Sequence, residues 1–150
     1  MFLDVLFTPF TQLPDLGEEC HTQSVALAVG GAANVARAAA ALGMDVTLGT
    51  ELGEGPISRL VEPMLEAYGV GLGASVRRAG WDVPCTAAIP YEGDRMFYTG
   101  GLPSAPLATT ERVLAEQAQH LTVSLERDTM PLLAGERERG TRIWADVGHD

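Results

Sequence analysis

Residues 30–43 of the 150-residue chain read GGAANVARAAAALG, and this stretch is the most informative about the fold. The glycine pair is followed by residues that nearly all favour helix, so a helix is expected over 32–42. Gly43 stands directly after it, where a glycine commonly ends a helix. Residues 18–29 alternate in apolar character and predict a strand before the glycine pair. The pattern is therefore strand, glycine turn, helix.

Outward from this stretch, strand and helix patterns continue to alternate. The predicted strands are 2–7, 18–29, 45–50, 70–77, 83–91, 95–99, 121–125 and 141–147; the other predicted helices are 56–68, about ten residues capped by Thr109 or Thr110, and 129–139. This alternation favours an α/β fold with a mainly parallel sheet flanked by helices. The strand at 18–29 and the hairpin at 83–99 are antiparallel pieces that do not fit the alternation, and they predict a small accessory sheet.

Composition narrows the function classes. The net charge is −10, from 20 acidic residues against 10 arginines and no lysine, so a surface that binds nucleic-acid phosphates is not expected. No apolar run reaches the roughly 18 residues of a membrane-spanning helix, and Asp4 stands where a signal peptide would carry positive charge. We therefore expect one cytoplasmic domain with no membrane partner.

The cysteines and histidines predict no metal site and no disulfide framework. Cys20 and Cys85 stand far apart, and neither belongs to a C-x-x-C pair. The three histidines have no ligand spacing such as H-x-x-x-H. Reduced, structural thiols are expected.

The glycine turn at 30–31 is the candidate for chemistry. Two glycines at a helix N-terminus let a ligand approach the backbone N–H groups closely. Asn34, the only asparagine, follows with an amide that both donates and accepts hydrogen bonds, which suits vicinal hydroxyls. The alternative is a turn that merely allows close packing of the alanine-rich helix. A dinucleotide site is weakly supported, because the G-x-G-x-x-G pattern is absent.

With its spacing intact, this motif resembles the N-terminal signature of the ribokinase-like (PfkB) family of carbohydrate kinases. The matching positions are Gly30, Gly31, Ala32, Asn34, Ala36, Gly43 and Gly53. The resemblance implies a ribokinase-like α/β fold with a small accessory β lid, of which about half is present. Residues 1–150 would be the N-terminal part of a single domain, with lid strands at about 2–29 and 83–99 and an α/β core at about 30–82 and 105–150.

The resemblance also implies roles for particular residues. Asp4, Gly30, Gly31, Asn34 and Glu126 would bind substrate, and Asp146 would lie at the mouth of the nucleotide cleft. For Glu126 a solvated loop acid is an equal alternative, and for Asp146 a helix cap or loop residue. The family's Gly-Ala-Gly-Asp segment, with its catalytic base, does not occur in the sequence. No catalytic residue is therefore assigned within 1–150.

The function implied by the resemblance is that of an ATP-dependent sugar or nucleoside kinase, here a partial chain that is inactive alone. ATP and Mg²⁺ are expected for the full-length enzyme. The expected ligand is a sugar or nucleoside, and a homodimer through the lid strands is expected as a further partner. The alternative is a non-catalytic small-molecule binding or subunit module with half of the fold.

Overall fold

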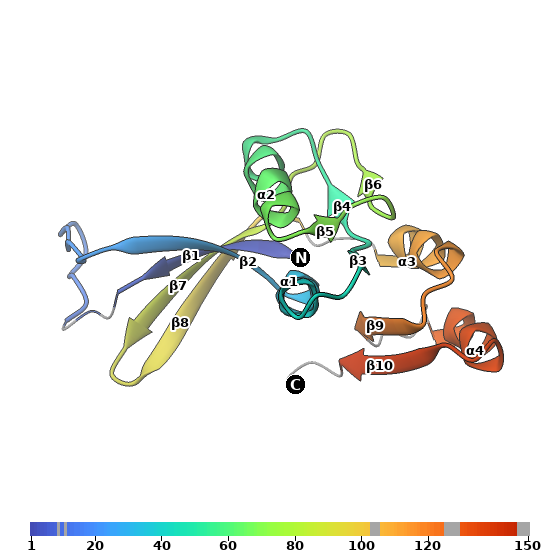
Figure 1. Ribbon diagram of the computed structural model, residues 1–150. Helices are drawn as coiled ribbons and strands as arrows, with labels where there is room; N and C mark the ends of the chain where they lie inside the picture. Colours follow the sequence, from blue (N-terminus) through green and yellow to red (C-terminus); the bar gives the residue numbers. More distant parts are fainter. Residues whose placement is uncertain (9, 11, 103–105, 125–129, 147–150) are drawn as a thin grey trace.

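The computed structural model describes residues 1–8, 10, 12–102, 106–124 and 130–146 and has α/β architecture (Figure 1). Its elements in chain order are β1 (Phe2–Phe7), β2 (Val25–Gly30), α1 (Ala32–Ala41), β3 (Val46–Thr47), β4 (Glu51–Leu52), α2 (Pro56–Ala67), β5 (Val70–Gly71), β6 (Val76–Arg77), β7 (Cys85–Tyr91), β8 (Asp94–Gly100), α3 (Pro106–Ala115), β9 (His120–Ser124), α4 (Met130–Glu138) and β10 (Arg142–Asp146). Among these, no helix has both the length and the apolar character needed to cross a bilayer.

Strands β2, β1, β7 and β8 form, in that order, a four-stranded sheet, called the accessory sheet below. It extends away from helices α1 and α2 (Figure 1). Strand β1 pairs antiparallel with β2 and parallel with β7, and β7 and β8 form an antiparallel hairpin. Glu92 and Gly93 make the tight turn with φ of 50° and 81°, as a two-residue hairpin turn of this kind requires. The hairpin predicted at 83–99 is confirmed.

The remaining strands pair in parallel, as the alternating pattern predicts. The pairs are β3 with β5, β4 with β6, and β9 with β10. The strand predicted at 70–77 is broken into β5 and β6, and the strand predicted at 45–50 is shortened to β3, with β4 following just beyond it. The sequence did not indicate either break. At the break the Ser75 hydroxyl donates to the Leu48 carbonyl at 2.8 Å and accepts from the Thr50 N–H at 3.3 Å. At this point, hydrogen bonds to a side chain thus replace the backbone hydrogen bonds between neighbouring strands.

The core joins helices α1 and α2 to the inner end of the accessory sheet. Helix α1 buries Ala33 and Ala36, which are small enough to let the helix pack closely. Helix α2 buries Val61 and Leu65. The other buried apolar residues of this cluster are Leu3, Val29, Leu48, Leu52, Val70, Trp81 and Val83. The core therefore fixes the end of β2 and the start of α1, where the glycine turn lies.

Two predicted boundaries are wrong. Strand β2 begins at Val25 rather than at residue 18, because the Thr8 hydroxyl accepts hydrogen bonds from the N–H groups of Gln23 and Ser24 at 3.1 and 3.4 Å. These bonds occupy the N–H groups with a side chain instead of a neighbouring strand. Helix α3 begins at Pro106, so Thr109 lies inside the helix rather than at its cap. Proline is well suited to a first helical turn.

Candidate functional site

The side chain of Asp4 lies against the backbone of Gly30. In the β1–β2 register Phe2 pairs with Gly30 and Asp4 with Ala28, so Phe2 and Asp4 share the face toward which a side chain at position 30 would point. A Cβ atom there would lie 2.6 Å from Oδ2 of Asp4 and would overlap the Phe2 ring. Glycine at position 30 is therefore what lets the carboxylate approach the start of the glycine turn.

Asp4 carries a partly buried carboxylate beside the glycine turn. It makes no hydrogen bond or ion pair with any of the described residues, and burial raises its pKa above the usual value. An unpaired carboxylate in such a position is unfavourable for folding alone. It is therefore available to accept hydrogen bonds from a ligand.

Gly31 ends the turn and precedes α1. Its φ of 67° and ψ of −139° lie in a region that residues with a side chain rarely adopt. No side chain caps the helix, and its first turn contains no acidic residue. The first backbone N–H groups of α1 are thus left without side-chain acceptors, an arrangement that favours an electronegative ligand group.

Asn34 lies in the first turn of α1, and its backbone N–H donates to the Gly31 carbonyl at 2.9 Å. Its side chain is exposed, and Oδ1 accepts a long hydrogen bond of 3.5 Å from Nη2 of Arg37. The Arg37 guanidinium also lies over the Tyr68 ring, 5.1 Å from its centroid. Arg37 was missed by the sequence reasoning, although its i+3 spacing from Asn34 could have revealed the contact.

A second polar cluster holds the N-terminus of α2. Both oxygens of the Asp82 carboxylate accept from the helix: Oδ2 from the Ile57 N–H at 3.0 Å, and Oδ1 from the Ser58 N–H at 2.7 Å and the Ser58 hydroxyl at 2.6 Å. Burial acts to raise the pKa of Asp82, but these bonds and one from the Val83 N–H outweigh it and lower the pKa. No local sequence pattern indicates this cap, because Ser58 and Asp82 are 24 residues apart.

The last glycine of the motif belongs to this polar cluster. The Gly53 N–H donates to the Ser58 hydroxyl at 2.8 Å. A Cβ atom at position 53 would overlap the backbone carbonyl of Trp81. Gly53 therefore lets its own backbone pack against the backbone at Trp81, whereas Gly30 and Gly31 form the turn beside Asp4.

Sequence and structure comparisons now identify the family. The family model described as "pfkB family carbohydrate kinase" matches residues 8–134, which is most of the chain. The chain belongs to the pfkB family. This confirms the resemblance indicated by the glycine motif. No curated protein matches the chain in sequence.

Solved structures of sugar kinases share the fold of this pfkB chain. Fructokinase from Xylella fastidiosa is 18% identical with a TM-score of 0.73, and the match covers 99% of this chain and 50% of that one. Arabidopsis thaliana ribokinase, solved with ribose and ATP, is 18% identical with a TM-score of 0.69, and the match covers 99% and 51%. A microbiome-derived acarbose kinase is 19% identical with a TM-score of 0.74, and the match covers 97% and 50%. The chain thus spans about half the length of these structures, and the predicted partial ribokinase-like fold is confirmed.

The predicted site residues of the pfkB chain are only partly brought together. Asp4, Gly30 and Gly31 are adjacent in space, and Asn34 follows one helical turn later without a hydrogen bond to Asp4. Glu126 lies outside the described residues. Asp146 is exposed at the end of β10, where it pairs in register with Ser124.

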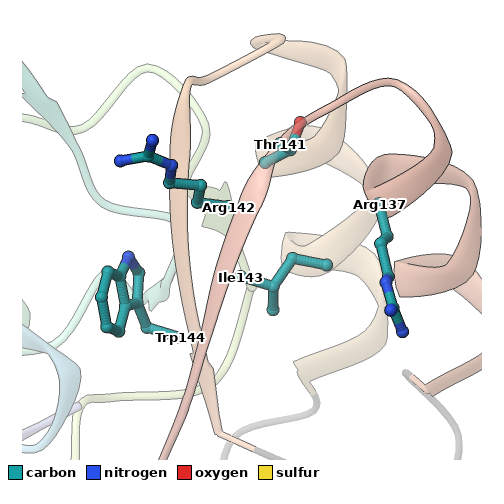
Figure 2. Close-up of a pocket in the computed structure, with 5 residues that line it drawn as sticks. All are labelled: Arg137, Thr141, Arg142, Ile143 and Trp144. Atoms are coloured by element: carbon teal, nitrogen blue, oxygen red, sulfur yellow. The ribbon is translucent and has the colours of Figure 1, made fainter.

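An open cavity of about 500 Å³ lies beside β10. It is lined by Arg137, Thr141, Arg142, Ile143 and Trp144. Figure 2 shows Arg142 and Trp144 on one side of the strand and Ile143 on the side of Arg137. The cavity includes neither Asp4 nor Asn34, so it is separate from the glycine turn.

Within the described ranges, no three side chains of the His, Cys, Asp or Glu type gather to hold a metal ion.

Proposed function

We propose that this chain is the substrate-binding half of an ATP-dependent pfkB carbohydrate kinase, and that it binds the hydroxyl groups of a sugar or nucleoside. The observation that carries the proposal is the partly buried carboxylate of Asp4, which lies against Gly30 and has no partner among the described residues. Family membership and the fold shared with sugar kinases support it.

The site residues offer complementary hydrogen-bonding groups. An ionised Asp4 accepts from hydroxyl groups, and the backbone N–H groups that follow Gly31 donate to hydroxyl oxygens. The exposed Asn34 amide does both, which suits neighbouring hydroxyls on a ring. We propose that Glu126 adds a further acceptor for substrate and that Asp146 belongs to the nucleotide cleft.

Catalysis in the proposed enzyme depends on parts outside the described residues. Phosphoryl transfer is promoted mainly by positioning and by stabilising charge on the moving group. In the full-length enzyme ATP and Mg²⁺ supply the phosphoryl group and part of that stabilisation. The base is proposed to lie beyond Asp150, because residues 1–150 contain no Gly-Ala-Gly-Asp segment. The chain alone is therefore expected to have no kinase activity.

The alternative is a non-catalytic binding or subunit module. It is favoured by the lack of a Gly-Ala-Gly-Asp segment within residues 1–150. The parent coding sequence after Asp150 separates the two: a downstream Gly-Ala-Gly-Asp segment supports the kinase, and a stop codon supports the module.

We further propose that the protein is cytoplasmic, binds no nucleic acid or membrane, and forms a homodimer through the accessory sheet. The net charge of −10 disfavours contact with nucleic acids. Exposed apolar side chains on the outer strands of the sheet support the dimer; they are Val25, Leu27 and Tyr98.

Titration calorimetry of the pure chain against ribose, fructose and adenosine tests the proposed binding. One hydrogen bond contributes a factor of a few to about ten in affinity. Asn34→Ala is therefore expected to lower the affinity for the most tightly bound of these ligands by about that factor. Gln119→Ala is the matched control, since it removes an exposed amide from another surface. Absence of binding by a folded chain contradicts the proposal.

Spectroscopy can locate the ligand directly. Because Asn34 is the only asparagine, labelling with ¹⁵N-asparagine gives one side-chain amide nitrogen signal. That signal is expected to shift on titration with the tightest ligand. The same samples, given ATP and Mg²⁺, are expected to form no sugar phosphate, and formation of it would show that the chain is catalytic alone.

A further inference from the structure

A row of polar side chains crosses the accessory sheet beside the glycine turn. Asp4 of β1 pairs in register with Thr86 of β7, and Thr86 pairs with Thr99 of β8. Register partners on adjacent strands share a face of the sheet. The two threonine hydroxyls and the Asp4 carboxylate therefore lie on the face toward which position 30 points.

The two threonines differ in exposure and are hydrogen-bonded to each other. Their Oγ1 atoms are 2.9 Å apart. Thr86 is buried at 5% exposure, whereas Thr99 is exposed. Thr86 has no other hydroxyl partner among the described residues, and a buried hydroxyl proton without an acceptor is unfavourable. Thr86 therefore donates to Thr99, which leaves the Thr99 proton free to point outward.

We propose that Thr99 is a substrate-binding and specificity-determining residue of this site, held in place by Thr86. This inference rests on the proposed binding of a sugar or nucleoside by Asp4. The Thr99 hydroxyl donates to an oxygen of the same ligand whose other hydroxyl is bound by Asp4. No rearrangement of the Thr86–Thr99 bond is required, because that bond leaves the donor free.

The spacing of the row limits the ligand. Adjacent strands lie about 4.8 Å apart, so the backbones at Asp4 and Thr99, which are two strands apart, are separated by about 10 Å across the sheet. After one hydrogen bond at each end, about 4–5 Å remains between the two ligand oxygens. Hydroxyls on adjacent carbons are closer than this. The ligand class is therefore a sugar ring that presents non-adjacent oxygens, rather than a short diol.

The test compares Thr99→Val with Thr99→Ser, using calorimetry against ribose, fructose and adenosine. Valine keeps the shape and favours strands, so the variant is expected to fold. Thr99→Val is expected to lower the affinity for the most tightly bound ligand about three- to tenfold, whereas the affinity of Thr99→Ser should stay within about twofold of wild type. Thr122→Val is the control, because it removes an exposed threonine hydroxyl from β9.

A double variant and the Asn34→Ala variant separate binding from folding and from the proposed function. The double variant of Thr86→Val with Thr99→Val leaves no orphaned hydroxyl and is expected to lose the same affinity without losing thermal stability. If Asn34→Ala weakens binding but Thr99→Val and the double variant do not, this inference is overturned while the proposed function stands. If the wild-type chain binds none of the three ligands, both are overturned.

Discussion

Asp4 and Gly30 are mutually dependent: the carboxylate of one occupies the space that a side chain on the other would need. Oδ2 of Asp4 lies 2.6 Å from the position of a Cβ atom at residue 30. The contact joins β1 to the last residue of β2, directly before the turn that begins α1. This single contact thus accounts both for the carboxylate in an otherwise apolar strand and for the glycine at this position of the motif.

Gly30→Ala is expected to destabilise the fold and to displace Asp4. The new methyl group overlaps the Phe2 ring and crowds the carboxylate, and overpacking of this kind costs about 1–3 kcal/mol. Urea unfolding measures the loss. Gly100→Ala is the matched control, because a Cβ atom there meets nothing within 4 Å and the residue also lies in the accessory sheet. Equal stability of the two variants would show that position 30 is not crowded.

Asp4→Asn is expected to raise stability at neutral pH, because burial makes the ionised form unfavourable. The raised pKa means that the folded chain holds the Asp4 proton more tightly than the unfolded chain, whose value is near 3.8. Stability contributed by this group falls as pH rises from about 3.8 through the folded pKa, and then stays constant. The variant should therefore exceed wild type by about a few tenths of a kcal/mol at pH 7.

The same comparison at pH 3 should show a smaller difference, since Asp4 is then protonated in both states. Urea unfolding at the two pH values measures this. A variant that is less stable than wild type at pH 7 would reveal a hydrogen bond to the carboxylate and so contradict the unpaired state of Asp4.

Local features of the structure could be predicted from the sequence, because their causes are local. Helix α1 follows from its run of alanines, and the turn of the β7–β8 hairpin follows from Glu92 and Gly93, whose positive φ angles suit a two-residue turn. The glycine motif located the turn beside Asp4. Each of these depends on residues a few positions apart.

Features created by distant contacts could not be predicted. The Thr8 hydroxyl shortens β2 from 15 residues away, and Ser75 breaks two strands by bonding to Leu48 and Thr50. The row of Asp4, Thr86 and Thr99 exists only because β1 lies next to β7, a pairing that no local pattern specifies. Register across strands, rather than the identity of the elements, is what the sequence left open.

Asp82→Ala is expected to loosen the start of α2. The variant removes the acceptor of two helix N–H groups and of the Ser58 hydroxyl, and loss of an N-terminal cap costs about 1–2 kcal/mol. Thermal unfolding measures the change. Asp45→Ala removes an exposed carboxylate elsewhere and serves as the control. A difference no larger than that of the control would mean that the cap does not stabilise the helix.

The same carboxylate predicts a pH dependence opposite to that of Asp4. Because the pKa of Asp82 is lowered in the folded state, its contribution is fully present above the unfolded value near 3.8 and is lost as pH falls through the folded value. The stability difference between wild type and Asp82→Ala should therefore be constant from pH 5 to 7 and shrink below pH 4. A difference that persists unchanged at the lowest pH at which the chain folds would exclude the ionised form as the source.

Leu27→Glu is expected to disrupt the proposed homodimer. Leu27, Val5, Ala87 and Tyr98 are register partners across the accessory sheet, so they form an apolar row on the face opposite Asp4. Leu27 and Tyr98 are 45% and 69% exposed in the single chain. A charge in the middle of such a surface must be desolvated on association, which is strongly unfavourable without a partner.

Light scattering distinguishes the two states. The wild type is expected at twice the chain mass of 15.9 kDa, and Leu27→Glu at the chain mass itself. Leu60→Glu places the same charge on α2 at a similarly exposed leucine and should remain dimeric. Both variants should melt like wild type apart from any stabilisation due to association, which depends on concentration. A wild-type chain that stays at 15.9 kDa at every concentration would contradict the proposed homodimer.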